Sequence, residues 1–102
     1  MTVVASGDYG KPRPAVVIQS DLIPETQSVL VCLVTSTLRD APAFRLPVGP
    51  GEGTGLDLAS QVQIDKIMAV PRAKVGKAIG RLRPEALTEL NQRLALMIGL
   101  AD

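Results

Sequence analysis

Short apolar segments punctuated by proline and glycine constrain this chain more than any other feature of its sequence. The segments are rich in Val, Ile and Leu, which favour strands, and residues that favour turns bound them. Pro47 cannot donate a hydrogen bond to a neighbouring strand, so its segment is expected at a sheet edge or a strand end. The pattern predicts a mainly β protein, with strands at residues 2–5, 15–19, 29–35, 43–48, 57–64, 67–70 and, more weakly, 73–79.

The end of the chain carries a different pattern, that of one amphipathic helix. Proline suits the first turn of a helix, and apolar residues follow it at helical spacing on one face. The pattern runs through Pro84, Leu87, Leu90, Leu94 and Met97 or Ile98, and ends before Gly99. A chain of 102 residues has room for one core, so residues 1–102 are predicted to form a single domain. We expect a small, strongly curved β-barrel or sheet covered by a C-terminal helix.

Two connections within this sheet are predicted to be turns. Residues 48–55 have a glycine at every second position, and we expect a mobile turn region there. Asp65 and Lys66 separate two apolar runs, and we expect a turn between two strands at that point.

The absence of histidine excludes several kinds of catalytic site. Imidazole is the commonest general acid or base near neutral pH and a common metal ligand. Ser-His-Asp and Cys-His triads, two-histidine ribonuclease chemistry and His-ligated metals are therefore excluded from this chain. The single cysteine, Cys32, lies in an apolar run without a histidine or neighbouring cation, so we expect a buried, inert thiol. We expect no metal and no other cofactor.

The charges of the chain are nearly balanced, with eleven Lys and Arg against ten Asp and Glu. A nucleic-acid site must therefore be a local cationic patch. The best candidate is Lys11-Pro12-Arg13-Pro14, in which the prolines favour an extended backbone that displays both cations. The guanidinium group has donors arranged to bind phosphate. A solvated loop beside structural prolines is the alternative interpretation.

Polar side chains form two further candidate clusters. Thr35, Ser36 and Thr37 place three hydroxyl groups at the end of an apolar strand, where they would surround a ligand or simply make a turn. Gln61 and Gln63 alternate with apolar residues and so share one face of a strand. Their amides would read base edges there, or would be the solvated side of a half-buried strand.

These motifs together resemble a known family. Segment 10–21, GKPRPAVVIQSD, is similar to the signature segment of the MazF/PemK toxins. Residues 31–36 are similar to the family's strand ending in Thr-Ser or Thr-Ala. Residues 60–62 and 65–67 are similar to its later Gln-containing strand, and residues 80–82 to its Gly-Arg-Leu before a terminal helix. The resemblance covers nearly the whole chain.

The resemblance implies an SH3-like small β-barrel of five to seven strands, a fold shared with the CcdB gyrase poisons. It also implies a homodimer and a metal-independent endoribonuclease that cuts single-stranded RNA at short sequences. The partner would be a cognate antitoxin of a type II toxin–antitoxin system. The family's catalytic Arg and Thr fall on Arg13 and Thr35.

Without histidine or a metal, we expect the substrate's own 2′-hydroxyl to attack the adjacent phosphorus, with Arg13 stabilising the developing charge and Thr35 binding a non-bridging oxygen. Side chains expected to bind RNA are Lys11, Ser36, Arg39, Gln61, Gln63 and Lys66. Arg45 is a further candidate for the phosphate track. The sequence favours a cytoplasmic protein without a membrane segment. The alternatives are a gyrase-binding toxin without nuclease activity and a noncatalytic SH3-like interaction module.

Overall fold

The computed structural model describes residues 2–6, 13–51 and 53–101. Their secondary structure is a mainly β fold with one terminal helix, as predicted. The elements are β1 (Thr2–Ser6), β2 (Arg13–Val17), β3 (Ser28–Thr35), β4 (Arg45–Val48), β5 (Ser60–Pro71), a short 3₁₀ turn (Arg72–Lys74), β6 (Val75–Arg81) and α1 (Pro84–Met97).

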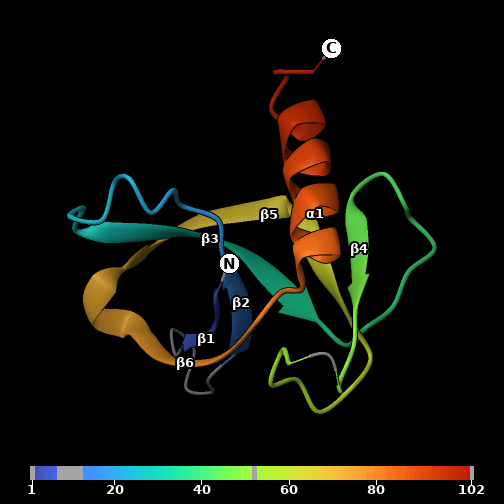
Figure 1. The fold of residues 1–102 in the computed structure, drawn as a ribbon, viewed down its shortest axis with the longest axis horizontal. Coiled ribbons are helices and arrows are strands. Elements are labelled where there is room, and N and C mark those ends of the chain that lie inside the picture. The colour runs from blue at the N-terminus through green and yellow to red at the C-terminus, as the bar shows by residue number, and fades with distance from the viewer. Residues whose placement is uncertain (1, 7–12, 52, 102) are drawn as a thin grey trace.

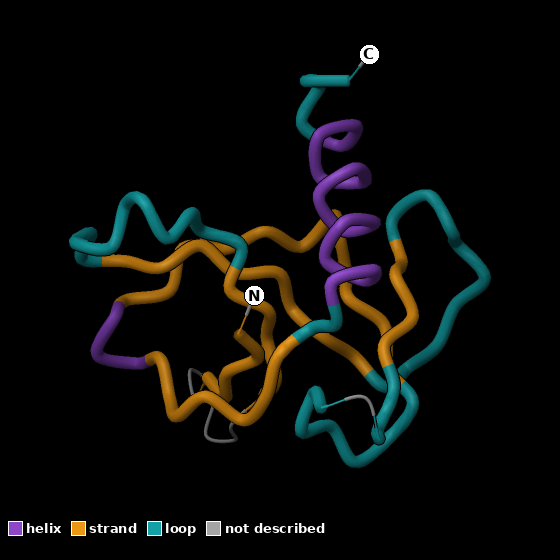
Figure 2. The backbone as a smooth tube through the Cα atoms, in the orientation of Figure 1, coloured by secondary structure: helices purple, strands orange, loops and turns teal. Residues whose placement is uncertain are grey.

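One curved sheet contains all six strands, in the order β4-β5-β3-β2-β1-β6 (Figures 1 and 2). All its strand pairs are antiparallel. The sheet is therefore open, with β4 and β6 at its two edges, instead of a barrel closed by hydrogen bonds between strands. The edge position of β4, predicted from Pro47, is confirmed.

The predicted turn at Asp65 and Lys66 is wrong, because β5 continues through both residues. A bulge explains the sequence signal. Between the pair Cys32–Ile67 and the pair Val34–Val62, β5 advances five residues while β3 advances two. Extra residues on one strand bend it and increase its twist. The polar residues thus mark the bend of one long strand, whose first half also pairs with β4.

The sheet buries side chains on both of its faces. One core cluster includes Val16, Cys32 and Ile64 and continues to Leu90 of α1. The other, smaller cluster includes Ala15 and Val31, which are sequence neighbours of residues in the first. Central strands that are covered on both sides have continuous apolar runs instead of alternation. This explains the continuous apolar runs at residues 15–18 and 29–34.

Helix α1 has the predicted bounds, and it packs against β4 and β5. Leu90 is fully buried, and Leu87 and Leu94 are half-buried. Met97 and Ile98 are exposed, because the last turns of the helix extend beyond the sheet (Figure 1).

The connection between β4 and β5 packs against β6, although we expected a mobile turn there. The side chain of Thr54 is only 1% exposed. The backbone carbonyl of Gly53 accepts a hydrogen bond of 2.9 Å from the Arg81 amide. A Cβ atom on Gly55 would lie 2.1 Å from the Ile79 carbonyl oxygen, so only glycine permits this approach. The loop that follows edge strand β4 therefore packs against the other edge strand, β6.

Candidate active site

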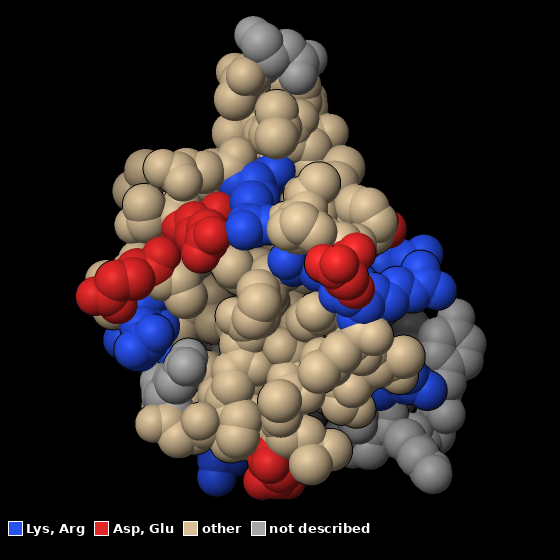
Figure 3. Space-filling model, turned by 90° about the vertical axis from the view of Figure 1, so that its right-hand side faces the viewer, with Lys and Arg blue, Asp and Glu red and all other residues tan. Residues whose placement is uncertain are grey.

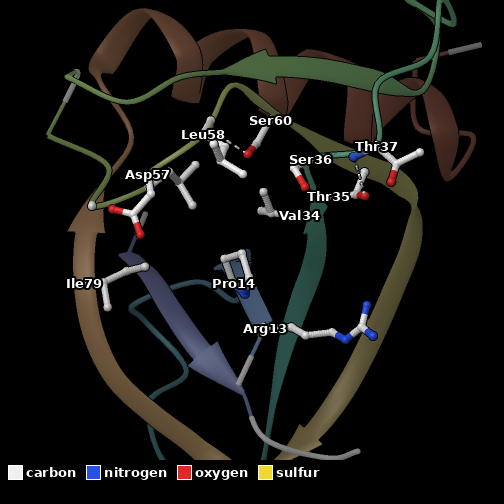
Figure 4. Close-up of a pocket in the computed structure, with 12 residues that line it drawn as sticks. Arg13, Pro14, Val34, Thr35, Ser36, Thr37, Asp57, Leu58, Ser60 and Ile79 are labelled. Atoms are coloured by element: carbon white, nitrogen blue, oxygen red, sulfur yellow. Dashed lines mark hydrogen bonds between the residues drawn. The ribbon is translucent and has the colours of Figure 1, made fainter. Parts of the chain in front are cut away.

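A pocket of about 440 Å³ opens where β2 begins and β3 ends. Three residues predicted for catalysis or RNA binding line it: Arg13, Thr35 and Ser36. The other lining residues are Pro14, Val34, Thr37, Gly55, Leu56, Asp57, Leu58, Ser60 and Ile79. Figure 4 shows Arg13, Thr35, Ser36 and Thr37 on one side of this pocket, with Asp57, Leu58 and Ile79 on the other.

The pairing of β2 with β3 explains why Arg13 and Thr35 share a pocket. Ala15 pairs with Leu33 in this antiparallel ladder. The same register, continued by two residues, brings Arg13 across from Thr35, and residues directly across a ladder project from the same face. Arg13 is exposed, so its guanidinium group is available to a ligand.

Thr35 has one of its hydrogen-bonding functions already engaged. Its Oγ1 accepts a hydrogen bond of 3.1 Å from the backbone N–H of Thr37. A hydroxyl group has one donor hydrogen and two acceptor lone pairs. With a lone pair held by the backbone, the O–H hydrogen can donate into the pocket. The turn thus orients Thr35 as a donor, which is what an anionic oxygen requires.

The opposite wall contains residues that sequence reasoning missed. Gly55, Leu56, Asp57 and Leu58 come from the connection between β4 and β5, and Ile79 comes from β6. Asp57, the first residue of a predicted strand, lies instead in the connection that precedes β5. No local pattern in the sequence indicates that this connection folds back to the beginning of β2.

Gln61 lies outside this pocket, and its amide is engaged by the protein itself. Its Oε1 accepts hydrogen bonds of 3.0 Å from the Arg39 amide and from Arg45 Nη1. Its Nε2 donates to the Arg39 carbonyl oxygen at 2.9 Å. Gln61 therefore fixes the connection that follows β3 to the beginning of β5.

Arg39, Arg45 and Gln61 line a separate pocket of about 400 Å³ beside α1. Arg45 is 8% exposed, and its Nη1 also donates to the Thr37 carbonyl oxygen, so it supports the fold instead of forming part of an exposed phosphate track. Arg39 is exposed. Figure 3 shows cationic and anionic side chains interspersed across this side of the molecule.

The remaining predicted RNA-binding residues lie apart from the pocket or outside the described chain. Gln63 is half-buried and pairs with Arg45 across β5 and β4. Lys66 is exposed at the bend of β5. Lys11 lies outside the described residues.

Cys32 is a buried free thiol, as predicted. Burial, and secondarily the negative charge of Asp65, raise the pKa of this thiol to about 11.

Among the described residues, no three His, Cys, Asp or Glu side chains come together as a potential metal site. No helix in the described part of the chain has the length and apolar character needed to span a membrane.

The fold of this chain, a curved sheet with a C-terminal helix packed on β4 and β5, is similar to that of solved toxin and endoribonuclease structures. The "Mycobacterium tuberculosis toxin MazF-mt6" aligns with a TM-score of 0.85, at 23% identity, over 98% of each chain. An "Endoribonuclease in complex with its cognate antitoxin from Mycobacterial species" aligns with a TM-score of 0.81, at 24% identity, over 97% of this chain and 93% of the other.

Sequence comparison defines the family. Residues 2–98 match the family described as "PemK-like, MazF-like toxin of type II toxin-antitoxin system". The "Probable endoribonuclease MazF" of Mycolicibacterium smegmatis is 38% identical over 101 residues, which cover 98% of this chain and 93% of the relative. The chain belongs to the PemK/MazF family of toxins, and the predicted family is confirmed.

Proposed function

We propose that this toxin is an endoribonuclease that cleaves single-stranded RNA, and mRNA in particular, without a metal. The observation that carries the proposal is the meeting of Arg13 with the Thr35 and Ser36 hydroxyl groups in one open pocket. A cation and hydroxyl donors together match the charge and hydrogen-bonding capacity of a phosphodiester. The 38% identity to a relative named as an endoribonuclease supports the same activity.

The proposed reaction uses the 2′-hydroxyl of the RNA as its nucleophile. This oxygen loses its proton and bonds to the adjacent phosphorus, while the bond from phosphorus to the 5′-oxygen breaks and that oxygen gains a proton. The products are a 2′,3′-cyclic phosphate and a 5′-hydroxyl end. The chain has no histidine to move these protons, so other side chains of the protein must assist the reaction.

Arg13 is assigned to the phosphoryl group in this reaction. Guanidinium has a pKa of about 12.5–13.8 and is a poor base near neutrality, but it stabilises negative charge that develops on phosphate oxygens. It also has a proton to donate to the leaving 5′-oxygen. Thr35 is assigned to a non-bridging oxygen, to which its free O–H hydrogen can donate.

Binding along the RNA is assigned to a few dispersed side chains. Ser36 is in the pocket, and Arg39 and Lys66 are exposed cations outside it. Lys11 and Gln63 are kept in this set, whereas Gln61, the remaining predicted residue, is left out because its amide binds Arg39 and Arg45. Since the net charge is only +1, local cations must supply the electrostatic attraction. RNA affinity should then fall as salt rises, through release of counterions.

We further propose that the toxin acts in the cytoplasm as a homodimer and is neutralised by a cognate antitoxin protein. The solved relative in complex with its cognate antitoxin supports the second partner. The exposed apolar side chains at the end of α1, Leu96, Met97, Ile98 and Leu100, supply surface that a second copy would cover. Sedimentation equilibrium of the purified toxin tests the dimer, and a monomer across the micromolar range would exclude it.

The test of the activity compares the parent toxin with Arg13→Ala on a long single-stranded RNA in EDTA. We expect the parent to cut, leaving 5′-hydroxyl ends that polynucleotide kinase can label directly. Loss of one preorganised donor of this kind costs about 10²–10³ in rate, and Arg13→Ala should lose about that much.

The matched control is Lys77→Ala, which removes an exposed cation of β6 outside the pocket and should cut at the parent rate. Parent-like cleavage by a folded Arg13→Ala variant would overturn the role of Arg13. Complete inhibition by EDTA would overturn the metal-free reaction. A parent that cuts no RNA but inhibits gyrase would instead identify a gyrase-binding toxin.

A further inference from the structure

We propose that Asp57 reads a base of the RNA, and that it selects guanine at one of the two nucleotides flanking the cleaved phosphate. The inference rests on the proposed nuclease function and adds a specificity-determining residue to it. It begins from the asymmetry of the pocket, whose wall opposite Arg13 ends in a carboxylate (Figure 4).

The carboxylate of Asp57 has no assigned task within the protein. Asp57 is exposed, and no hydrogen bond or ion pair among the described residues engages it. Arg13 is likewise free of an ion pair among them. The two opposite charges therefore line one pocket without neutralising each other, and both remain available to a ligand.

The two charges determine how a nucleotide is oriented when it binds in the pocket. A phosphate is attracted to the Arg13 side and repelled by the carboxylate, so the base must lie toward Asp57. The wall on that side also contains Leu58 and Ile79, which are 63% and 40% exposed. Apolar side chains of this kind can pack against the face of a base where aromatic residues are absent.

The chemistry of a carboxylate determines which base it selects. An ionised carboxylate only accepts hydrogen bonds, through two oxygens side by side. Single-stranded RNA exposes the Watson–Crick edges of its bases to such groups. Guanine has two adjacent donors on that edge, N1–H and the 2-amino group, and can satisfy both oxygens. Cytosine and adenine place an acceptor beside their amino group, and uracil has acceptors on both sides of its single N–H.

The backbone around Asp57 is held firmly enough to support recognition. Thr54 Oγ1 donates to the Gly49 carbonyl oxygen at 2.9 Å and accepts from the Leu56 amide at 3.2 Å. Gly55 has a φ of +75° and packs on the backbone of Ile79. A reading group held by rigid neighbours keeps its geometry when substrate binds.

The experiment compares Asp57→Asn, Asp57→Ala and the parent toxin on RNA oligonucleotides in which each nucleotide flanking the cleavage site is varied to all four bases. We expect the parent to prefer guanine at one position. Asp57→Ala should relax that preference by about 10-fold to 100-fold. Asp57→Asn should relax it too, because an amide has one acceptor and one donor and so matches the adjacent donor and acceptor that the Watson–Crick edge of every base presents.

Asp65→Asn is the matched control, since it neutralises an exposed carboxylate of β5 outside the pocket and should keep the parent's preference. Asp57 is exposed, so neither of its substitutions removes buried packing. A parent preference for another base, or an unchanged preference in both Asp57 variants, overturns the reading role while the nuclease function stands. A parent that cuts no RNA overturns the nuclease function, and this inference with it.

Discussion

The hydrogen bonds of Gln61 lead to a quantitative prediction about stability. The side chain makes one bond to the charged guanidinium of Arg45 and two to the backbone of Arg39. A hydrogen bond to a charged group contributes about 1.5–3 kcal/mol and a neutral one about 0.5–1.5 kcal/mol. Water can replace part of the bonding at Arg39, which is exposed, but not at Arg45, which is 8% exposed.

Gln61→Leu should therefore lower the free energy of unfolding by about 2–4 kcal/mol. Arg45 Nε is already buried without a hydrogen-bond partner, so the variant leaves this guanidinium still less satisfied. With an m-value of about 1–3 kcal/mol/M in urea, the unfolding midpoint should fall by about 0.7–4 M. Far-UV circular dichroism measures that midpoint, at one protein concentration for all variants because dimerisation would shift it.

Gln61→Glu is the matched comparison for this effect. Its carboxylate retains both acceptor functions and its charge strengthens the contact with Arg45, but it turns an anionic oxygen toward the Arg39 carbonyl in place of the amide donor. We expect it to recover at least half of the stability that Gln61→Leu loses. A Gln61→Leu variant within about 0.5 kcal/mol of the parent that has lost its discrimination between RNA sequences would refute the reasoning. Gln61 would then read bases directly.

Three further predictions concern the core, the loop and the thiol. Leu90→Ala, at a fully buried helix position, should cost about 2–5 kcal/mol in chemical denaturation, whereas Leu96→Ala on the exposed end of α1 should cost the monomer fold much less. Gly80→Ala places a Cβ 2.2 Å from the Thr54 backbone, so we expect lower solubility and a lower melting temperature; an unchanged melting temperature would contradict this packing. Native Cys32 should resist thiol reagents at pH 8 and react after unfolding. Because its folded pKa is about 11 against 9.0 for an ordinary thiol, its contribution to stability is complete below about pH 9 and is lost as pH rises toward 11. Cys32→Ala should remove that part of the alkaline loss of stability.

Where the sequence predicted correctly, the signal was local. Proline and apolar spacing placed α1 at the correct residues, because a helix is organised over three to four neighbouring positions. The buried thiol of Cys32 followed from its apolar neighbours. The same reasoning misplaced a turn at Asp65, since a bulge in a long strand has the same polar residues as a tight turn. What separates the two is the partner strand, which local sequence does not identify.

The sequence by itself determined the class of fold, the family motifs and the two residues, Arg13 and Thr35, around which the proposed chemistry is arranged. The tertiary structure alone decided what surrounds them. The register of β2 and β3 brings these two residues to one pocket, and the packing of Gly55 on Ile79 carries Asp57 to its far wall. Composition and periodicity indicate which side chains are buried and which are exposed to solvent. They do not record which distant segments meet, because those meetings depend on the packing of the whole chain.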